Sequence, residues 1–260
     1  MSRAAVVTGA ARGIGAATVR ALAADGWRVL AVDRCGDDPA IPYALGTRED
    51  LEQVALEAGE GVAWRVADVR DPVAVADAIG DAEERFGRLD AAVSAAGVIA
   101  GGLPAWELPP ERELAVVEVD LLGVAHLARA AVPALLRRPE PRSGRFLAVA
   151  SAAATRGLPM LAAYCAAKAG VVGYVRALAV ELGGTGVTAN VVSPGSTRTP
   201  ILEESARLYG LEGTGAFVAQ QPIGRLLEPH EVAAVLVFLA GDAAGAMTGA
   251  VVAVDGGMSL

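Results

Sequence analysis

A glycine-rich turn between an apolar segment and a helical segment constrains this chain most. The sequence TGAARGIG occupies residues 8–15, directly after the apolar run at residues 4–7. Gly9 permits a tight turn, Gly13 permits the backbone to approach a phosphate, and Gly15 permits close helix packing. The N-terminus of the following helix adds N–H donors and a favourable dipole for an anion. The turn therefore predicts a dinucleotide site, with a plain strand-to-helix turn as the alternative.

The rest of the chain alternates short apolar segments with longer helical ones. We expect strands at residues 4–7, 28–32, 62–67, 89–93, 145–149, 187–192 and 251–254, and helices at residues 13–24, 72–86, 111–136, 162–182 and 231–240. The strands are continuous apolar runs, as in parallel sheets that are buried on both faces. This pattern predicts an α/β, Rossmann-type doubly wound fold with helices on both faces of the sheet. Because no linker interrupts it, we expect a single domain over residues 1–260.

Composition excludes several classes of protein. The 260 residues are 53% hydrophobic and 20% charged, with a mean hydropathy of +0.43, so the chain is not disordered. A net charge of -8 without a basic stripe argues against a nucleic-acid partner. Two cysteines make no disulfide framework and no apolar leader precedes the first turn, so we expect a cytoplasmic protein. The longest apolar run near the end, residues 232–240, is too short to cross a membrane.

An acidic residue stands where a ribose-binding carboxylate is expected. Asp33 ends the second predicted strand, roughly 20 residues after Gly15. A carboxylate accepts a hydrogen bond from a ribose 2′-hydroxyl but repels a 2′-phosphate, so NAD is predicted rather than NADP. Arg12 and Arg34 are counter-evidence, because an arginine there accepts a phosphate.

Two later loops also follow predicted strands, at the edge where open α/β sheets bind ligands. Asp68 and Val69 end the third strand, where carboxylate and backbone are placed to hold an adenine. Ala95, Ala96 and Gly97 follow the fourth strand and are small enough for backbone to pass close to a cofactor.

Three residues later in the chain form a candidate catalytic group. Tyr164 and Lys168 lie at positions i and i+4 of a predicted helix and therefore share one face. A nearby cation stabilises a phenolate and lowers the pKa of the phenol. Ser151 follows the fifth strand, where its hydroxyl is placed to bind a substrate oxygen. Chance pairing on a helix surface is the alternative, but Lys168 is the one lysine among 22 basic residues.

Together these motifs resemble the short-chain dehydrogenase/reductase family over essentially the whole chain. The matching residues are Thr8, Gly9, Gly13, Gly15, Asp68, Ser151, Tyr164, Lys168, Asn190, Ser193, Pro194, Gly195, Thr199, Thr248, Gly249, Asp255, Gly256 and Gly257. The resemblance implies a seven-stranded Rossmann-type sheet, a nicotinamide cofactor and hydride transfer at a carbinol or carbonyl. It implies Tyr164 as the acid/base, Ser151 as the group that positions the oxygen, and Lys168 as the residue that lowers the pKa of Tyr164. The cofactor-binding residues expected are Gly9, Arg12, Gly13, Ile14, Gly15, Asp33, Arg34, Asp68, Val69, Ala95, Ala96, Gly97, Tyr164, Lys168, Pro194, Gly195, Thr197 and Thr199.

Two positions depart from the family pattern. Ala95 stands where the family usually has asparagine, and Asp120 stands where the family has its fourth catalytic residue, an asparagine. An aspartate accepts hydrogen bonds but loses the amide donor and adds a charge. A carboxylate near Lys168 keeps the ammonium charged and weakens its effect on Tyr164. We expect Asp120 to be catalytic, with a structural role as the alternative.

A second resemblance is narrower. An insertion at about residues 34–48 follows the second strand and is longer than ordinary α/β connections. Its Ile-Pro-Tyr-x-Leu-x-Thr ending resembles the mycofactocin-coupled, carveol-dehydrogenase-like branch of the family. That branch implies tightly bound, non-exchanging NAD that mycofactocin, as an external redox carrier, reoxidises in place. A surface insertion without cofactor contact is the alternative.

The substrate side is predicted to be apolar. Residues 196–221 are typical of a mobile lid over the site. The lid contains Leu202, Leu208, Tyr209, Leu211 and Phe217, and the opposite wall contains Trp106, Leu158, Met160 and Leu161. Each of these side chains is equally compatible with the core. His126 and His230 have no ligating neighbours, so no metal is expected.

The sequence thus predicts an NAD-dependent oxidoreductase that acts between a secondary alcohol and its ketone. One alternative is an NADPH-dependent 3-oxoacyl thioester reductase, which would favour arginine at position 33. The other is a non-catalytic NAD-binding sensor or scaffold on the same fold, which Asp120 keeps open. The family resemblance implies a homotetramer.

Overall fold

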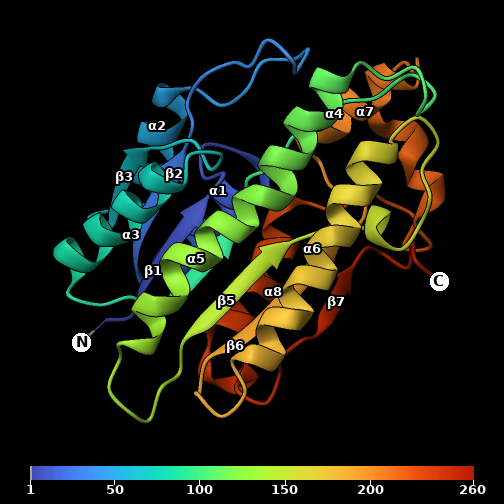
Figure 1. The fold of residues 1–260 in the computed structure, drawn as a ribbon. Coiled ribbons are helices and arrows are strands. Elements are labelled where there is room, and N and C mark those ends of the chain that lie inside the picture. Colours follow the sequence, from blue (N-terminus) through green and yellow to red (C-terminus); the bar gives the residue numbers. More distant parts are fainter. Residues whose placement is uncertain (1) are drawn as a thin grey trace.

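Seven apolar segments pair into one parallel sheet in the computed structural model, which describes residues 2–260 (Figure 1). The strands are β1 (Ala4–Thr8), β2 (Arg28–Asp33), β3 (Val62–Val66), β4 (Ala91–Ser94), β5 (Arg145–Val149), β6 (Thr188–Pro194) and β7 (Val251–Val254). Their order across the sheet is β3-β2-β1-β4-β5-β6-β7. The order reverses direction between β1 and β4, which is where doubly wound sheets bind dinucleotides. The predicted Rossmann-type fold is confirmed.

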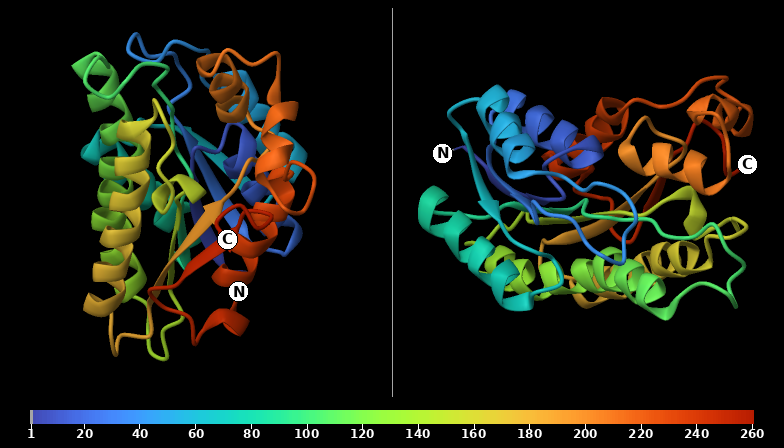
Figure 2. Two further views of the ribbon diagram at one scale, coloured as in Figure 1. Left: turned by 90° about the vertical axis from the view of Figure 1, so that its right-hand side faces the viewer. Right: turned by 90° about the horizontal axis from the view of Figure 1, so that it is seen from above.

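Helices cover both faces of this sheet, as Figure 2 shows from above. One layer contains α1 (Gly13–Ala24), α2 (Arg48–Ala58) and α8 (Pro229–Ala240), and the other contains α3 (Pro72–Phe86), α5 (Gly123–Leu136) and α6 (Ala162–Glu181). Alternate residues of β1 point into opposite layers, because Val6 belongs to the same buried cluster as Leu127 while Val7 belongs to the cluster that contains Leu22. The sheet therefore separates two apolar cores.

Local signals in the sequence begin the helices of these layers. The Asp71 carboxylate accepts hydrogen bonds from the N–H groups of Val73 (2.8 Å) and Ala74 (3.2 Å) at the start of α3. Pro72 fills the first turn, where its missing N–H costs nothing. Thr47 and Asp50 form a reciprocal capping box that begins α2 at the end of the insertion.

The long helix predicted at residues 111–136 is interrupted. The structure has α4 (Pro110–Val117), a π-helical turn at Glu118–Leu122, and then α5. Pro133, a residue that commonly bends or ends a helix, lies inside α5. The π turn widens the helix and leaves Asp120 fully buried. Such turns carry functional residues in many proteins.

Two segments project beyond the carboxyl ends of the strands (Figure 1). One is the insertion at residues 34–48, which has no regular helix until α2 begins. The other is the predicted lid, which contains α7 (Pro200–Leu208) and a 3-10 turn at Thr214–Gln220. Further 3-10 turns occur at Ala152–Ala154 and Asp242–Ala244. The insertion and the predicted lid lie at the edge where the ligand site is expected.

Candidate active site

One cavity at the carboxyl ends of the strands collects nearly all of the predicted site residues. Its walls include Gly9, Arg12, Gly13, Ile14, Gly15, Asp33, Arg34, Asp68, Val69, Ala95, Ala96, Gly97, Ser151, Tyr164, Lys168, Pro194, Gly195, Thr197 and Thr199. The remaining predicted residue, Asp120, is buried behind Gly97. A Cβ atom placed on Gly97 would lie 3.6 Å from Oδ2 of Asp120 and 3.3 Å from Nζ of Lys168.

The glycine-rich turn forms a cradle suited to a diphosphate. Gly9 and Gly13 have φ values of 69° and 57°, which side-chain-bearing residues rarely adopt. A Cβ atom on Gly13 would lie 3.3 Å from Cγ2 of Thr199, which faces it across the groove. No side chain caps the N-terminus of α1, so its N–H groups remain open to an anion. The turn therefore fits the diphosphate of a dinucleotide.

Asp33 lies beside this cradle and is held by backbone donors. Its Oδ2 accepts from the Ala11 N–H at 3.0 Å, and its Oδ1 accepts from the Cys35 N–H at 3.3 Å. A carboxylate has further acceptor sites beyond these two bonds. Asp33 lines the cavity, so it is placed to accept hydrogen bonds from ribose hydroxyls.

The carboxylate of Asp68, which we expect to hold an adenine, also has partners within the protein. Arg70 binds both of its oxygens, through Nε at 3.1 Å to each oxygen and through Nη2 at 2.7 Å to Oδ2. Arg34 also lies 3.3 Å from Oδ2. Arg34 and Arg70 each contact Oδ2 of Asp38 at 2.7 Å. Two arginines and two aspartates thus form a neutral network at this end of the cavity.

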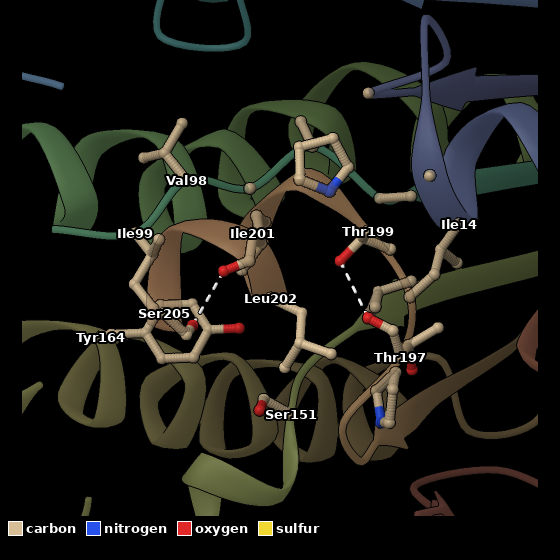
Figure 3. Close-up of a pocket in the computed structure, with 18 of the residues that line it drawn as sticks. Ile14, Val98, Ile99, Ser151, Tyr164, Thr197, Thr199, Ile201, Leu202 and Ser205 are labelled. Carbon is tan, nitrogen blue, oxygen red and sulfur yellow. Dashed lines mark hydrogen bonds between the residues drawn. The ribbon is translucent and has the colours of Figure 1, made fainter. Parts of the chain in front are cut away.

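The candidate catalytic residues meet at the other end of the cavity. Figure 3 shows the Tyr164 hydroxyl directed into the pocket, with Ser151 beside it and Leu202 opposite. Ser151 follows β5, and its Oγ accepts from the Ala153 N–H at 3.1 Å. Nζ of Lys168 lies 5.6 Å from the centre of the Tyr164 ring and donates to the Val149 carbonyl at 3.2 Å. The predicted helix spacing therefore brings phenol and ammonium together.

A buried ion pair lies behind this group. Nζ of Lys168 is 3.2 Å from Oδ2 of Asp120, and both side chains are 5% exposed or less. Oδ1 of Asp120 accepts from the Val98 N–H at 2.8 Å. Burial raises the pKa of Asp120, while Lys168 and this N–H oppose the increase. Asp120 in turn raises the pKa of Lys168 despite burial, so the ammonium stays charged.

Burial also raises the pKa of Tyr164 above its ordinary value. The charge of Lys168 lowers this pKa, the Asp120 carboxylate raises it, and a hydrogen bond with Ser151 lowers it. The site thus contains the phenol and cation expected for proton transfer, together with one carboxylate that works against them.

The space around Tyr164 is apolar. Its lining residues are Val98, Ile99, Ala153, Leu158, Leu161, Ile201, Leu202, Tyr209, Phe217 and Met258. Ser205 and Gln220 also line it, and the Ser205 hydroxyl is already bonded to the Ile201 carbonyl at 2.8 Å (Figure 3). No lysine or arginine other than Lys168 lines this end in the described part of the chain.

Four residues predicted for the substrate side do not line the cavity. Trp106 is 84% exposed, and Leu208, Leu211 and Met160 also lie outside the lining. These four residues are apolar like those that line the cavity, so the sequence alone does not tell the two sets apart. Conversely, Met258 of the C-terminal segment enters the cavity and has no local signal in the sequence.

The insertion contributes a side chain that the sequence did not single out for contact with the site. The Tyr43 hydroxyl accepts a hydrogen bond from the Ile99 N–H at 3.1 Å, just beyond β4. Arg12 lies 5.9 Å from the centre of the Tyr43 ring and donates to the Ala44 carbonyl at 2.8 Å. The insertion therefore spans from the glycine-rich turn to the loop after β4 and lines the cavity through Asp38, Ile41, Leu45 and Gly46.

Comparison with known proteins agrees with this geometry. A protein-family model described as enoyl-(acyl carrier protein) reductase matches residues 9–259. The chain is 38% identical to cis-4-hydroxycyclohexanecarboxylate dehydrogenase of Sinomonas cyclohexanicum, over 98% of this chain and 96% of that protein.

Two solved structures are similar throughout. Carveol dehydrogenase from Mycobacterium avium, in complex with NAD, superposes with a TM-score of 0.93 at 30% identity, over 98% of this chain and 97% of the other. A 3-ketoacyl-(acyl-carrier-protein) reductase from Brucella melitensis, complexed with NADH, has a TM-score of 0.88 at 30% identity, over 99% of this chain and 98% of the other. The chain therefore belongs to the short-chain dehydrogenase/reductase family, as its motifs predicted, and it is an oxidoreductase of that family.

Proposed function

We propose that this protein transfers a hydride between an uncharged, apolar secondary alcohol or its ketone and NAD. One observation carries the proposal. Ser151, Tyr164 and Lys168 converge on the apolar end of the same cavity whose other end is a nucleotide cradle. Asp33 beside the cradle supports NAD rather than NADP, and carveol dehydrogenase was solved with NAD.

The chain's own residues account for the proton chemistry. Bound NAD supplies the hydride acceptor at C4 of its nicotinamide ring. The Ser151 hydroxyl holds the reacting oxygen, and Tyr164 takes the hydroxyl proton when an alcohol is oxidised or returns it when a ketone is reduced. Lys168 supports the phenolate through its charge and binds the nicotinamide ribose. Pro194, Gly195 and Thr199 line the cavity, and they would hold the nicotinamide ring.

The substrate end favours a neutral alcohol or ketone. The relative from Sinomonas acts on a ring that bears a carboxylate, whereas the apolar end of this cavity has no cation besides Lys168 among residues 2–260. A carboxylate there would be desolvated without a partner. We therefore propose an uncharged ring or chain as substrate.

We further propose that NAD stays bound through many turnovers and is reoxidised in place. The insertion lines one side of the cavity, and it is held there by the bond of Tyr43 with Ile99 and the bond of Ala44 with Arg12, which supports slow release. The reoxidising partner is a two-electron carrier, and mycofactocin is the one that the insertion's sequence pattern implies.

A 3-oxoacyl thioester reductase remains the second candidate, because the family model and the Brucella structure carry reductase names. Asp33 argues against the NADPH that such an enzyme was expected to use, and the complete Ser151, Tyr164 and Lys168 group argues against a non-catalytic sensor.

We propose a cytoplasmic homotetramer. Cys35 and Cys165 are free thiols, which fits a reducing compartment. The outer faces of α5 and α6 lie side by side and are uncovered in the single chain (Figure 1), which supports association through them.

Replacement of Tyr164 by phenylalanine tests the function. Removal of the hydroxyl should lower kcat for oxidation of secondary alcohols by roughly 10²–10⁴-fold, the usual contribution of a positioned acid/base. Binding of NAD, followed by calorimetry, should stay within a factor of about three. A Y164F protein that keeps full turnover would overturn the mechanism, and a parent protein that binds no NAD would overturn the function.

A further inference from the structure

The end of the cavity beside Asp33 contains groups that favour opposite cofactors. An arginine beside the ribose is the usual means of binding the 2′-phosphate of NADP. Here Arg12 and Arg34 both line the cavity together with Asp33. Two guanidinium groups in these places would be expected to favour NADP in spite of the carboxylate.

The insertion at residues 34–48 supplies ion-pair and hydrogen-bond partners for Arg34. Asp38 is 7% exposed, and its Oδ2 lies 2.7 Å from Nη1 of Arg34. The Asp37 carbonyl accepts from Nη2 of Arg34 at 2.8 Å, and Asp68 lies 3.3 Å from its Nε. All three nitrogens of this guanidinium therefore have partners within the protein, two of them from the insertion.

Asp38 is itself fixed in place. Its Oδ1 accepts from the Ala40 N–H at 2.8 Å, and Arg70 lies 2.7 Å from its Oδ2. Burial alone would raise the pKa of Asp38, but the Ala40 N–H, Arg34 and Arg70 hold it below its ordinary value. The carboxylate is charged at neutral pH and neutralises the arginine it binds.

The insertion also supplies partners for Arg12. Nη1 of Arg12 donates to the Ala44 carbonyl at 2.8 Å, and its guanidinium carbon lies 5.9 Å from the centre of the Tyr43 ring. Gly46 brings the end of the insertion against Asp33, where a Cβ atom would lie 3.6 Å from Oδ1. The same segment thus borders Asp33 and binds both arginines.

We infer that the insertion at residues 34–48 is a cofactor-selectivity element, in which Asp38 withholds Arg34 from the 2′-phosphate of NADP. The inference rests on the proposed function, because it assumes that a nucleotide occupies this cavity. A 2′-phosphate would have to displace Asp38 from a buried ion pair and would meet the negative charges of Asp33, Asp38 and Asp68. Selectivity for NAD is then shared between Asp33, which faces the ribose, and Asp38, which disables the arginine.

Asp38→Asn is the direct test, with Asp37→Asn as its matched control. Both changes remove one carboxylate from the insertion. The Asp37 side chain contacts the Leu45 N–H, while the contact of residue 37 with Arg34 uses its backbone carbonyl. Affinities for NAD and NADP would be measured by calorimetry on protein freed of nucleotide, with thermal melting as the check of folding. Asp38→Ser is a second variant, because serine keeps an acceptor for the Ala40 N–H.

We expect D38N and D38S to raise the affinity for NADP relative to NAD by about tenfold or more, since a charge-assisted hydrogen bond is worth roughly 1.5–3 kcal/mol. D37N should leave this ratio within about twofold of the parent, and Arg34→Met in the D38N background should abolish the gain. A D38N ratio equal to that of the parent, or an equal rise in D37N, would overturn the inference. If the parent binds neither nucleotide, the proposed function fails instead.

Discussion

At the scale of single residues, Asp120 is the most consequential side chain of the site. It replaces the asparagine that the family pattern led us to expect and forms a buried pair with Lys168, 3.2 Å from Nζ. The ammonium that should stabilise a Tyr164 phenolate is thereby partly neutralised. Burial and Asp120 both keep the pKa of Tyr164 high, against the lowering by Lys168. With aspartate at position 120, the Tyr164 phenol therefore stays protonated to higher pH than it would with asparagine there.

Asp120→Asn should move the pH dependence of alcohol oxidation toward acid. The base form of Tyr164 is needed for oxidation, so the rate rises as pH increases through the pKa of Tyr164. Without the carboxylate, Lys168 lowers that pKa, and the rise in kcat/KM begins at lower pH. Glu118→Gln is the control, because it removes one charge from the same π turn at a half-buried position. An unchanged pH profile in D120N, or equal shifts in both variants, would reduce Asp120 to a structural role.

Residue-level prediction depends least on tertiary context where chemistry dictates spacing. The Tyr164 and Lys168 pair and the glycine-rich turn are local patterns, and the structure places them in one cavity. It failed where a role depends on neighbours that the sequence does not reveal. The sequence predicts Trp106 as a wall of the cavity, but its side chain is 84% exposed and does not line the cavity.

At the scale of elements, the insertion is the segment that distinguishes this chain from a plain α/β connection. Asp37 accepts from the Leu45 N–H at 2.8 Å, so the two ends of the loop are tied together. Tyr43 then reaches Ile99 beyond β4, and the capping box at Thr47 begins α2. The insertion is thus hydrogen-bonded both to the glycine-rich turn, through Arg12, and to the loop after β4, through Ile99.

Tyr43→Phe should speed the exchange of bound NAD. The change removes the acceptor of the Ile99 N–H, a bond worth about 1 kcal/mol, so the release rate should rise roughly fivefold. The measurement is the rate at which isotopically labelled NAD replaces bound NAD, followed by mass spectrometry of the nucleotide.

Tyr209→Phe is the matched control for this exchange. The Tyr209 hydroxyl donates to the Pro159 carbonyl at 2.8 Å on the lid side of the cavity, so exchange should stay at the parental rate. An NAD exchange rate that is unchanged in Y43F, or fast in the parent protein, would contradict the proposal that the insertion slows the release of NAD.

The sequence predicts the bounds of helices and strands well where the hydrophobic pattern is regular, and less well where tertiary packing determines the local geometry. The bounds of α1, α3, β5 and β7 agree with the predicted ranges. The π turn at Glu118–Leu122 was missed because its residues favour an ordinary helix, and tertiary contacts set its width. Helix α7 lies within the predicted lid, for which the sequence analysis assigns no secondary structure.

At the scale of the whole molecule, two long apolar helical stretches need an explanation. Pro110–Leu136 and Ala162–Glu181 have mean hydropathies of 1.5 and 1.2, which is enough by length and composition to cross a membrane. They carry Asp120, Tyr164 and Lys168 and pack on the sheet, so they belong to the site. Only 44% and 39% of their most apolar windows are buried in the single chain. Their outer faces are therefore suited to a second copy of the chain.

Gly173→Arg should break this association without unfolding the chain. Gly173 is exposed on α6 near Ala169, Ala177 and Val180, and a Cβ atom on it would meet nothing within 4 Å. Small residues on this face allow two helices to approach closely, and an arginine would prevent the approach. Gly80→Arg on α3 is the control, since a Cβ atom there also meets open space.

Sedimentation velocity measures the result. The parent and G80R should sediment as one assembly larger than a monomer, and G173R should sediment as a smaller species with a native far-ultraviolet spectrum. A monomeric parent, or an unchanged assembly in G173R, would contradict association through α5 and α6.

The central claim is that Tyr164 enables hydride transfer from an uncharged secondary alcohol to NAD held in this cavity. The most direct measurement is a single turnover with cyclic secondary alcohols deuterated at the carbinol carbon, followed by mass spectrometry of the nucleotide released on denaturation. The account predicts deuterium-labelled NADH from the parent protein and unlabelled NAD from Y164F. Unlabelled nucleotide from the parent with every neutral alcohol tried, or equal labelling in Y164F, would contradict it.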